Sequence, residues 1–274
     1  MKKLFFFDID QTLYNGKTKE IPSQTTKLLQ TLAQNPNNIL GIATVRSYKG
    51  LSVLKELTSL FKYFVVLNGA ITWKATNIVQ QTCIPKELVI KLNCQAQKKG
   101  IIVINVSLEE KGITQTTDPD SKSLFDNVML QKNPIKSNLH LEKPIYKINL
   151  FHPNTSLVVD FLKDFEQIHV YYWKNGVVSL SAKQVNKAYV IQAIMKDNKD
   201  CQLICMGDGC SDFEMLQFAD IGIVMANTHY ETLHKVANLT APHIEKTLYM
   251  IFLKIIICYE VVYRRKNKMC FQCV

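Results

Sequence analysis

Short apolar runs alternate with amphipathic stretches over the first 70 residues. The runs at 4–7, 39–43 and 63–67 carry no charge, which is typical of strands buried on both faces of a parallel sheet. Pro22 and Ser23 can open a helix between the first two runs. Leucines then recur at helical spacing, at positions 28, 29 and 32 and again at 51, 54, 57 and 60. The alternation predicts a doubly wound α/β sheet, Rossmann-like, with right-handed crossovers.

The stretch from 73 to 183 has a different pattern. Helices are expected near 86–98 and 156–165, and loop residues gather at 117–120 and 132–138. Strands are expected at 101–108, 145–151, 168–173 and 177–181. We interpret this stretch as an α+β domain inserted into the first one, entered at Asn68-Gly69 and left near 183–186.

The first pattern then resumes, with a helix expected at 187–195, a strand at 202–206, a helix at 213–218 and a strand at 221–225. The predicted organisation is a split core domain, 1–72 and 184–246, with an inserted domain, 73–183. Residues 247–274 form an atypical tail that is first apolar and then basic.

Two acidic residues follow the first apolar run. Alternate residues of a strand face the same way, so Asp8 and Asp10 are expected to project together from one strand end. Ligands of open α/β sheets bind beyond the carboxyl ends of the strands. Two carboxylates there repel each other unless a cation or a shared proton relieves them. A hard-cation site with one carboxylate free to attack phosphorus is one interpretation; a simple turn is the other.

A second acidic group, Gly207-Asp208-Gly209-Cys210-Ser211-Asp212, directly follows the run 202–206. Asp208 would extend the carboxylate cluster on a neighbouring strand. Asp212 falls at a helix start, where a carboxylate also suits an N-cap.

Three further polar residues suit phosphate. Thr44 and Arg46 end the second strand with a hydroxyl and a guanidinium, and Lys187 begins a helix. A hydroxyl beside helix N–H groups can hold a phosphate oxygen, and a Lys can neutralise phosphate charge. Each alone has a simpler explanation, an N-cap for the Thr and a solvated surface position for the Lys.

Taken in order, these segments resemble the four motifs of the haloacid dehalogenase superfamily. They are Asp8-x-Asp10-x-Thr-Leu, then Thr44, then Lys187, then Gly207-Asp208-x-x-Ser-Asp212. The insert resembles the C2-type cap of its Cof-like, type IIB, phosphatases. Asn68-Gly69-Ala70 is similar to the residues that precede that cap. The stretch 220–227 is similar to the final core strand.

The resemblance implies a role for each matched residue. Asp8 would be the nucleophile that forms an aspartyl-phosphate, and Asp10 would act as acid and then as base. Phosphate or substrate would be bound by Thr44, Arg46, Asn68 and Lys187. Mg²⁺ would be held by Asp8, Asp10 (through its backbone carbonyl), Asp208 and Asp212. The cap would exclude water and choose the substrate, a small phosphorylated metabolite such as a sugar phosphate or a phosphorylated cofactor.

The chain departs from the family pattern in three places. Val45 stands where the second motif usually has Gly, Ser211 stands where Asn is commonest, and the tail replaces an acidic-Gly pair and a short helix. If the backbone at 45 needs a positive φ or a close approach to phosphate, valine lowers activity. The alternative function is therefore a catalytically impaired phosphate- or sugar-binding protein.

Composition and charge bear on partners and compartment. Eight cysteines in 274 residues do not suggest a disulfide scaffold, and no long uncharged run suggests a membrane span or a secretory leader. A reducing cytoplasm is the expectation. The formal net charge of +10 raises nucleic acid as a third hypothesis. No nucleic-acid-binding motif is evident, so no nucleic-acid or membrane partner is expected. The oligomeric state is left open.

Overall fold

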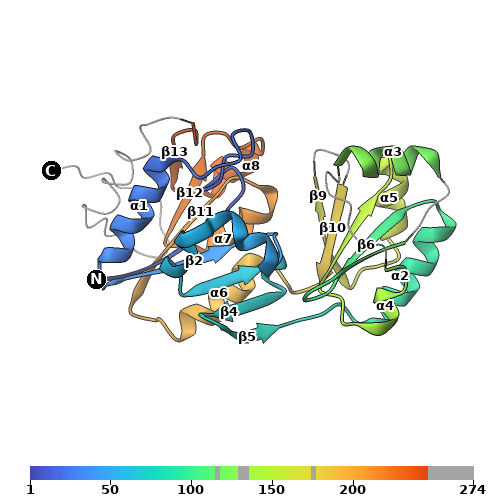
Figure 1. The fold of residues 1–274 in the computed structure, drawn as a ribbon, viewed down its shortest axis with the longest axis horizontal. Coiled ribbons are helices and arrows are strands. Elements are labelled where there is room, and N and C mark those ends of the chain that lie inside the picture. Colours follow the sequence, from blue (N-terminus) through green and yellow to red (C-terminus); the bar gives the residue numbers. More distant parts are fainter. Residues whose placement is uncertain (115–117, 129–135, 174–176, 246–274) are drawn as a thin grey trace. The chain divides into compact units, whose positions relative to one another are not determined.

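The computed structural model describes residues 1–114, 118–128, 136–173 and 177–245 (Figure 1). Contacts between Cα atoms divide the chain into two units, which we describe separately. The first comprises Met1–Ile42, Val53–Lys62 and the chain from Ala193 onward. The second comprises Ala43–Ser52 and Tyr63–Gln192.

A sheet of eight strands has the order β13-β12-β11-β1-β2-β3-β4-β5. Its strands are β1 (Lys2–Phe7), β2 (Asn38–Ala43), β3 (Tyr63–Val66), β4 (Ile71–Lys74), β5 (Asn77–Gln81), β11 (Cys201–Gly207), β12 (Ile221–Met225) and β13 (Leu239–Ala241). Pairing is parallel from β13 to β2, whereas β4 is antiparallel to both β3 and β5. The predicted α/β fold with a parallel core sheet is confirmed.

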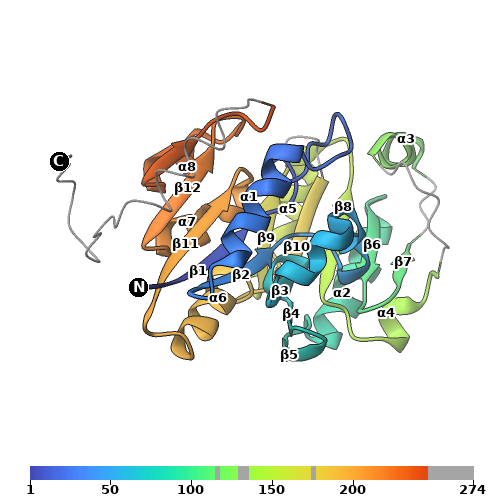
Figure 2. The ribbon, with the colours of Figure 1, turned by 60° about the vertical axis from the view of Figure 1, so that its left-hand side comes forward.

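The first unit has its core on β1. Leu4 and the three phenylalanines that follow are almost fully buried, and the rings of Phe5 and Phe7 stack 5.9 Å apart. Helix α1 (Ser23–Gln34) buries Leu28, Leu29 and Leu32, the face that the leucine spacing predicts. On the other side of β1, α7 (Phe213–Phe218) contacts β11, β12 and α8 (Glu231–Val236) (Figure 2). Burial on both faces explains why β1 carries no polar alternation.

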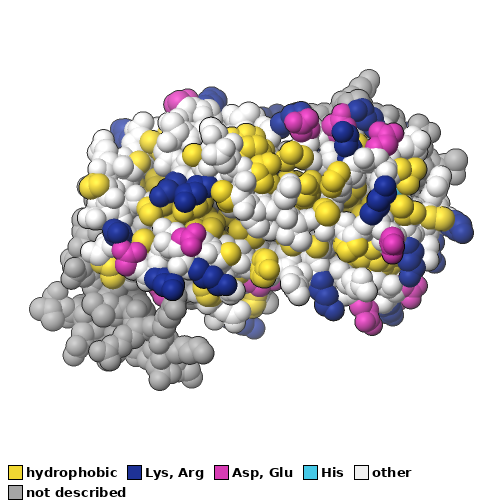
Figure 3. Space-filling view, turned by 90° about the horizontal axis from the view of Figure 1, so that it is seen from below, with side chains coloured by type: hydrophobic (Ala, Val, Ile, Leu, Met, Phe, Trp, Pro, Cys, Tyr) yellow, Lys and Arg dark blue, Asp and Glu magenta, His cyan; other side chains and the backbone are white. Residues whose placement is uncertain are grey.

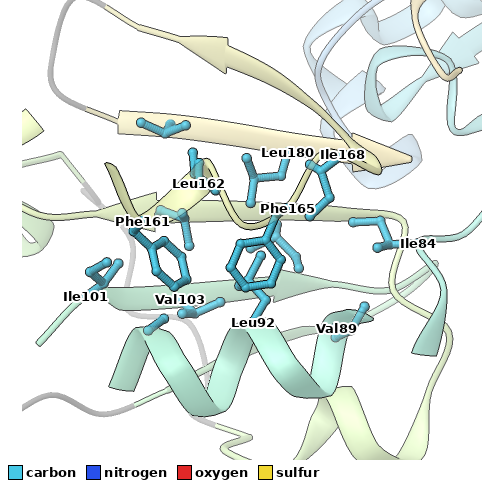
Figure 4. Close-up of a cluster of buried hydrophobic side chains, with 14 of the residues drawn as sticks. Ile84, Val89, Leu92, Ile101, Val103, Phe161, Leu162, Phe165, Ile168 and Leu180 are labelled. Atoms are coloured by element: carbon cyan, nitrogen blue, oxygen red, sulfur yellow. The ribbon is translucent and has the colours of Figure 1, made fainter. Parts of the chain in front are cut away.

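The second unit contains a sheet of five antiparallel strands, in the order β7-β6-β8-β10-β9. They are β6 (Ile102–Val106), β7 (Lys111–Ile113), β8 (Lys147–Phe151), β9 (Ile168–Tyr172) and β10 (Val177–Ala182). Its helices are α2 (Lys86–Lys98), α3 (Pro119–Val128), α4 (Leu139–Glu142) and α5 (Thr155–Leu162). Side chains from α2, α5 and the strands form one apolar cluster around Phe161 and Phe165 (Figure 4).

Some predicted elements differ from those observed. The leucines from 51 to 60 lie in a 3₁₀ segment, η1 (Tyr48–Leu60), rather than in an α-helix. The loop expected at 117–120 gives way to α3 from Pro119, and the loop expected at 132–138 lies largely outside the described residues. Strands β4, β5, β7 and β13 are not among the predicted strands. Because β13 (Leu239–Ala241) follows β12 at the edge of the sheet, the stretch 220–227 does not contain the last strand of its sheet.

The predicted domain boundaries remain a prediction. The eight-stranded sheet runs on through β5, to Gln81, beyond the boundary expected at residue 72. The helix expected at residue 187 is present as α6 (Lys187–Lys196). The tail 247–274 lies outside the described residues. Among those that are described, no helix combines the length and the apolar character that crossing a membrane requires.

Candidate active site

The loops that carry the two acidic motifs leave the sheet side by side. β1 pairs in parallel with β11, with Phe7 opposite Met206, and the amide of Asp8 donates to the carbonyl of Met206 over 2.9 Å. Asp8 is the first residue after β1, and Asp208 is the first after β11. Both therefore lie at the carboxyl edge of the sheet, where open α/β sheets bind ligands.

Three carboxylates meet at this edge. Asp8, Asp208 and Asp212 each offer one oxygen, and these oxygens all lie within 4.8 Å of one another. Asp8 and Asp212 are buried and Asp208 is half-buried. Burial strengthens the repulsion among the three charges, so a cation or a proton is needed to relieve it. An all-carboxylate donor set suits a hard divalent cation such as Mg²⁺.

Asp212 also shapes the loop that carries Asp208. Its Oδ2 accepts the amide protons of Asp208 and Gly209, over 3.0 and 2.9 Å, at the start of the short 3₁₀ turn η3 (Cys210–Asp212). Asp212 therefore caps the start of η3 from the third residue of that turn, whereas as the residue before α7 it makes no side-chain cap hydrogen bond. Its role as a cation ligand remains a prediction. Gly207 is required beneath it, because a Cβ there would lie 2.4 Å from the Asp212 carboxylate.

Asp10 lies two residues beyond Asp8, in the loop that follows β1. It follows β1 in a tight turn in which the amides of Leu13 and Tyr14 donate to the carbonyl of Ile9 and Gln11 has a φ of 58°. Asp8 and Asp10 both lie beyond the last residue of β1, so strand alternation does not fix where their side chains point, and the expected projection of the two together remains a prediction. Binding of a cation through the Asp10 backbone carbonyl remains a prediction.

Further residues of the first unit contact these loops, and sequence reasoning gave them no role. The hydroxyl of Thr12 donates to Oδ1 of Asp208 over 3.2 Å, and the hydroxyl of Thr228 donates to its carbonyl over 2.6 Å. The amide of Asn227 donates to the carbonyl of Gln11 over 2.8 Å. Thr12 could have been found from the first motif. Asn227 and Thr228 carry no local signal beyond following a strand.

In the second unit, the loop after β2 is tied to the turn after β3. The amide of Asn68 donates to the carbonyl of Thr44 over 2.9 Å, and that of Leu67 donates to the carbonyl of Arg46 over 2.8 Å. The hydroxyl of Thr44, fully buried, accepts the amide proton of Arg46 over 3.2 Å. The guanidinium of Arg46 donates to the carbonyl of Gly50 over 3.3 Å. Three of the predicted binding residues are thus assembled within one small region.

The turn after β3 has an unusual backbone. Leu67, Asn68 and Gly69 all have positive φ, at 49°, 63° and 99°. A Cβ on Gly69 would lie 2.4 Å from the carbonyl oxygen of Asn186, so only glycine fits there. This close approach brings the turn beside the residue that precedes Lys187.

Lys187 is fully buried, with none of its surface exposed. The alternative expectation, that Lys187 is a solvated surface residue, is therefore wrong. A buried ammonium group is costly unless it lies near compensating charge or hydrogen-bond acceptors. Binding of phosphate by Lys187 remains a prediction.

A small pocket adjoins Asn68 in the same unit. Asn68 is 3% exposed, and its Oδ1 has no hydrogen-bond partner among the described residues. Lys147, Trp173 and Ser179 line the same pocket, and sequence reasoning missed all three. Trp173 Nε1 donates to Ser179 Oγ over 2.8 Å, and Lys147 Nζ donates to the carbonyl of Val45 over 3.3 Å. Hydrogen-bond donors and acceptors therefore line this small hollow together with apolar side chains.

Val45 itself shows no sign of backbone strain. Its φ is not positive, unlike those of the six non-glycine residues of the described chain that have positive φ. The concern that valine cannot adopt the conformation of a glycine at this position is therefore not supported.

Comparison with known proteins places the chain in a family. The model of the haloacid dehalogenase-like hydrolases matches residues 5–250. A Streptococcus pyogenes protein, provisionally named a bifunctional phosphatase/peptidyl-prolyl cis-trans isomerase, is 26% identical over 233 residues, which cover 83% of this chain and 48% of that protein. The chain thus spans about half of its length. YkrA of Bacillus subtilis, provisionally named a phosphatase, is 24% identical over 82% of this chain and 86% of its own.

Solved structures share the fold. A sugar phosphatase of subclass IIB of the superfamily is 24% identical with a TM-score of 0.80, covering 94% of this chain and all of that one. A phosphatase from Bacteroides thetaiotaomicron is 18% identical with a TM-score of 0.82, covering 93% of this chain and 94% of that one. The resemblance drawn from the four motifs is confirmed at the level of the family. The chain belongs to the haloacid dehalogenase-like hydrolases.

Proposed function

We propose that this protein is a Mg²⁺-dependent phosphatase that hydrolyses a small phosphorylated metabolite through an aspartyl-phosphate on Asp8. The observation that carries the proposal is the meeting of Asp8, Asp208 and Asp212 at the carboxyl edge of the core sheet. Phosphoryl transfer depends mostly on positioning and on stabilising charge, and this cluster provides a nucleophile beside a cation site.

The chain's own residues supply the two chemical steps. An oxygen of Asp8 attacks phosphorus while the ester P–O bond breaks, and the leaving oxygen takes a proton from Asp10. Asp10 then accepts a proton from the water that attacks the aspartyl-phosphate, which releases inorganic phosphate and restores Asp8. Mg²⁺, held by Asp8, Asp208, Asp212 and the carbonyl of Asp10, would offset the negative charge of the phosphoryl oxygens.

Thr44 and Lys187 are proposed to bind the transferring phosphoryl group, with Arg46 and Asn68 beside them. The chemistry of the two groups supports this assignment, because an ammonium and a hydroxyl can both donate hydrogen bonds to phosphate oxygens.

For the substrate we propose a sugar phosphate or a phosphorylated cofactor. The name of one structural relative, a sugar phosphatase of subclass IIB, agrees with the first. The hollow beside Asn68 does not choose between them, because in this structure it has room for about one water molecule.

The test is phosphate release from a panel of sugar phosphates, phosphorylated cofactors and p-nitrophenyl phosphate, with Mg²⁺ or with EDTA. We expect hydrolysis only with Mg²⁺, and we expect Asp8→Asn to reduce it more than roughly 1,000-fold, equivalent to over about 4 kcal/mol. Asp164→Asn is the matched control, because Asp164 is an exposed carboxylate outside the cluster. Hydrolysis that survives Asp8→Asn would contradict the proposal.

A further inference from the structure

The turn that follows β12 lies against both acidic loops of the first unit. Its residues, Ala226-Asn227-Thr228, are anchored by the amide of Ala226, which donates to the carbonyl of Ala241 over 2.8 Å. Strand β12 pairs in parallel with β11, with Val224 opposite Gly207. The turn therefore leaves the sheet one strand away from the loop that carries Asp208.

Thr228 holds the backbone of Asp208. Its hydroxyl donates to the Asp208 carbonyl over 2.6 Å and accepts the amide proton of Tyr230 over 3.1 Å. The same aspartate donates its amide proton to Asp212 and receives the Thr12 hydroxyl proton on its carboxylate. Hydrogen bonds thus hold Asp208 at its amide, its side chain and its carbonyl. The bond to the carbonyl comes from the turn after β12.

Asn227 holds the loop after β1. Its Nδ2 donates to the carbonyl of Gln11 over 2.8 Å, and its Oδ1 accepts the amide proton of Ile244 over 3.1 Å. Because Nδ2 and Oδ1 are each hydrogen-bonded, the orientation of the Asn227 side-chain amide is fixed. Gln11 has a φ of 58° and directly follows Asp10, so this contact holds a strained position of the first motif.

Farther along the same loop, an ion pair joins it to the end of the described chain. Lys17 Nζ lies 3.4 Å from Glu245 Oε1, and the hydrogen bond from Lys17 holds the pKa of Glu245 below its usual value. The stretch 244–245 therefore contacts both Asn227 and the loop after β1.

We infer that Asn227 and Thr228 are positioning residues that set the spacing of the two acidic loops and thereby the affinity of the carboxylate cluster for Mg²⁺. The inference rests on the proposed function. Neither residue is a predicted cation ligand; each acts through a backbone carbonyl of a loop that carries ligands. Partners that orient metal ligands commonly change metal affinity or activity 10- to 100-fold when they are removed.

The test measures Mg²⁺ binding by isothermal titration calorimetry of the full chain. Thr228→Val removes the hydroxyl at almost constant shape, and Thr228→Ser restores it. Thr31→Val is the matched control, because the Thr31 hydroxyl also donates to a backbone carbonyl, that of Lys27, over 2.8 Å, but in α1. The stoichiometry reports the folded fraction and the Kd reports the site, so loss of folded protein is separated from loss of affinity.

Asn227→Ala tests the second contact in the same assay. Its control is Asn38→Ala, which removes an amide donor that also bonds a backbone carbonyl, that of Leu32, over 3.0 Å. If Thr228→Val does not fold, Thr228→Ala removes the same hydroxyl with a smaller side chain.

We expect Thr228→Val and Asn227→Ala to raise the Kd for Mg²⁺ roughly 10-fold, while Thr228→Ser and the two controls leave it nearly unchanged. A Kd unchanged in both Thr228→Val and Asn227→Ala would overturn the inference while leaving the proposed function in place. Wild-type protein that neither binds Mg²⁺ nor hydrolyses phosphate esters would remove the proposed function, and this inference with it.

Discussion

Asp212 contributes to the candidate site in two separable ways. One oxygen of Asp212 caps the backbone of the 208–209 loop through two hydrogen bonds, and its charge adds to that of the carboxylate cluster. A substitution that keeps an acceptor oxygen but removes the charge should therefore affect metal binding more than stability.

We predict this difference for Asp212→Ala and Asp212→Asn in saturating Mg²⁺. The alanine variant should lose about 2 kcal/mol in the free energy of unfolding, because two partly buried amides lose a charged acceptor. The asparagine variant should lose less than about 1 kcal/mol, because its amide oxygen still accepts. Both should weaken Mg²⁺ binding. Urea unfolding gives the stabilities, and equal stability of Asp212→Ala and wild type would contradict the capping role.

Val45 gives the second residue-scale prediction. Its φ is not positive, and its carbonyl accepts from Lys147, so neither feature requires glycine. Val45→Gly should change kcat by less than about tenfold, or about 1.4 kcal/mol, in either direction. Steady-state kinetics with the best substrate of the panel measures this. A much larger gain would favour the alternative of a chain impaired by valine.

The residues of the site differ in how far the sequence could predict them. Asp8, Asp208 and Asp212 follow apolar strands at recognisable spacing, and parallel pairing then brings strand ends together. Asn227 and Thr228 act through contacts to Gln11 and Asp208, residues far away in sequence. Such contacts depend on loop conformations that hydrophobic patterning does not encode. The burial of Lys187 could not be predicted from the sequence either, because lysine side chains are usually exposed to solvent.

At the scale of elements, η1 differs from the α-helix that the leucine spacing predicts. The leucines at 51, 54, 57 and 60 repeat every three residues, which is the repeat of a 3₁₀-helix, whereas an α-helix needs alternating steps of three and four. Leu51, Leu54 and Leu57 are indeed all buried. Strands β4 and β5 were missed for another reason. They are short, and β5 alternates between exposed and half-buried positions, so neither has an apolar run.

The same segment gives a prediction about stability. Lys55 interrupts η1 with φ 51° and ψ −132°, a conformation that L-residues other than glycine rarely adopt. Lys55 is exposed, so its side chain adds little packing. Lys55→Gly should therefore raise the free energy of unfolding by about 1 kcal/mol, whereas the same change at Lys27, in α1, should lower it by about 1 kcal/mol. Urea unfolding measures both; a loss of stability at Lys55 would contradict the strained backbone.

At the scale of the molecule, the net charge of +10 is unevenly distributed along the sequence. The tail from 248 contributes +4 and the insert 73–183 another +4, which leaves +2 for the remainder, including the carboxylate cluster. On the face drawn in Figure 3, basic and acidic side chains are interspersed rather than segregated. On this face the described side chains form no continuous basic stripe of the kind that follows a nucleic-acid backbone.

We therefore predict that the protein does not bind duplex DNA at physiological salt. A gel-shift titration from about 0.05 to 0.2 M salt measures this, since phosphate contacts give a steep salt dependence. Complexes that persist at the upper salt concentration would revive the nucleic-acid hypothesis.

The central claim is that Asp8 carries the phosphoryl group during turnover, and acid quenching tests it most directly. Enzyme is mixed with Mg²⁺ and a radiolabelled form of its best substrate, denatured in acid within one turnover, and digested for peptide mapping. We predict hydroxylamine-labile label on the peptide that contains Asp8, and none in Asp8→Asn. Rapid turnover without labelled protein, or label on a different peptide, would contradict the account.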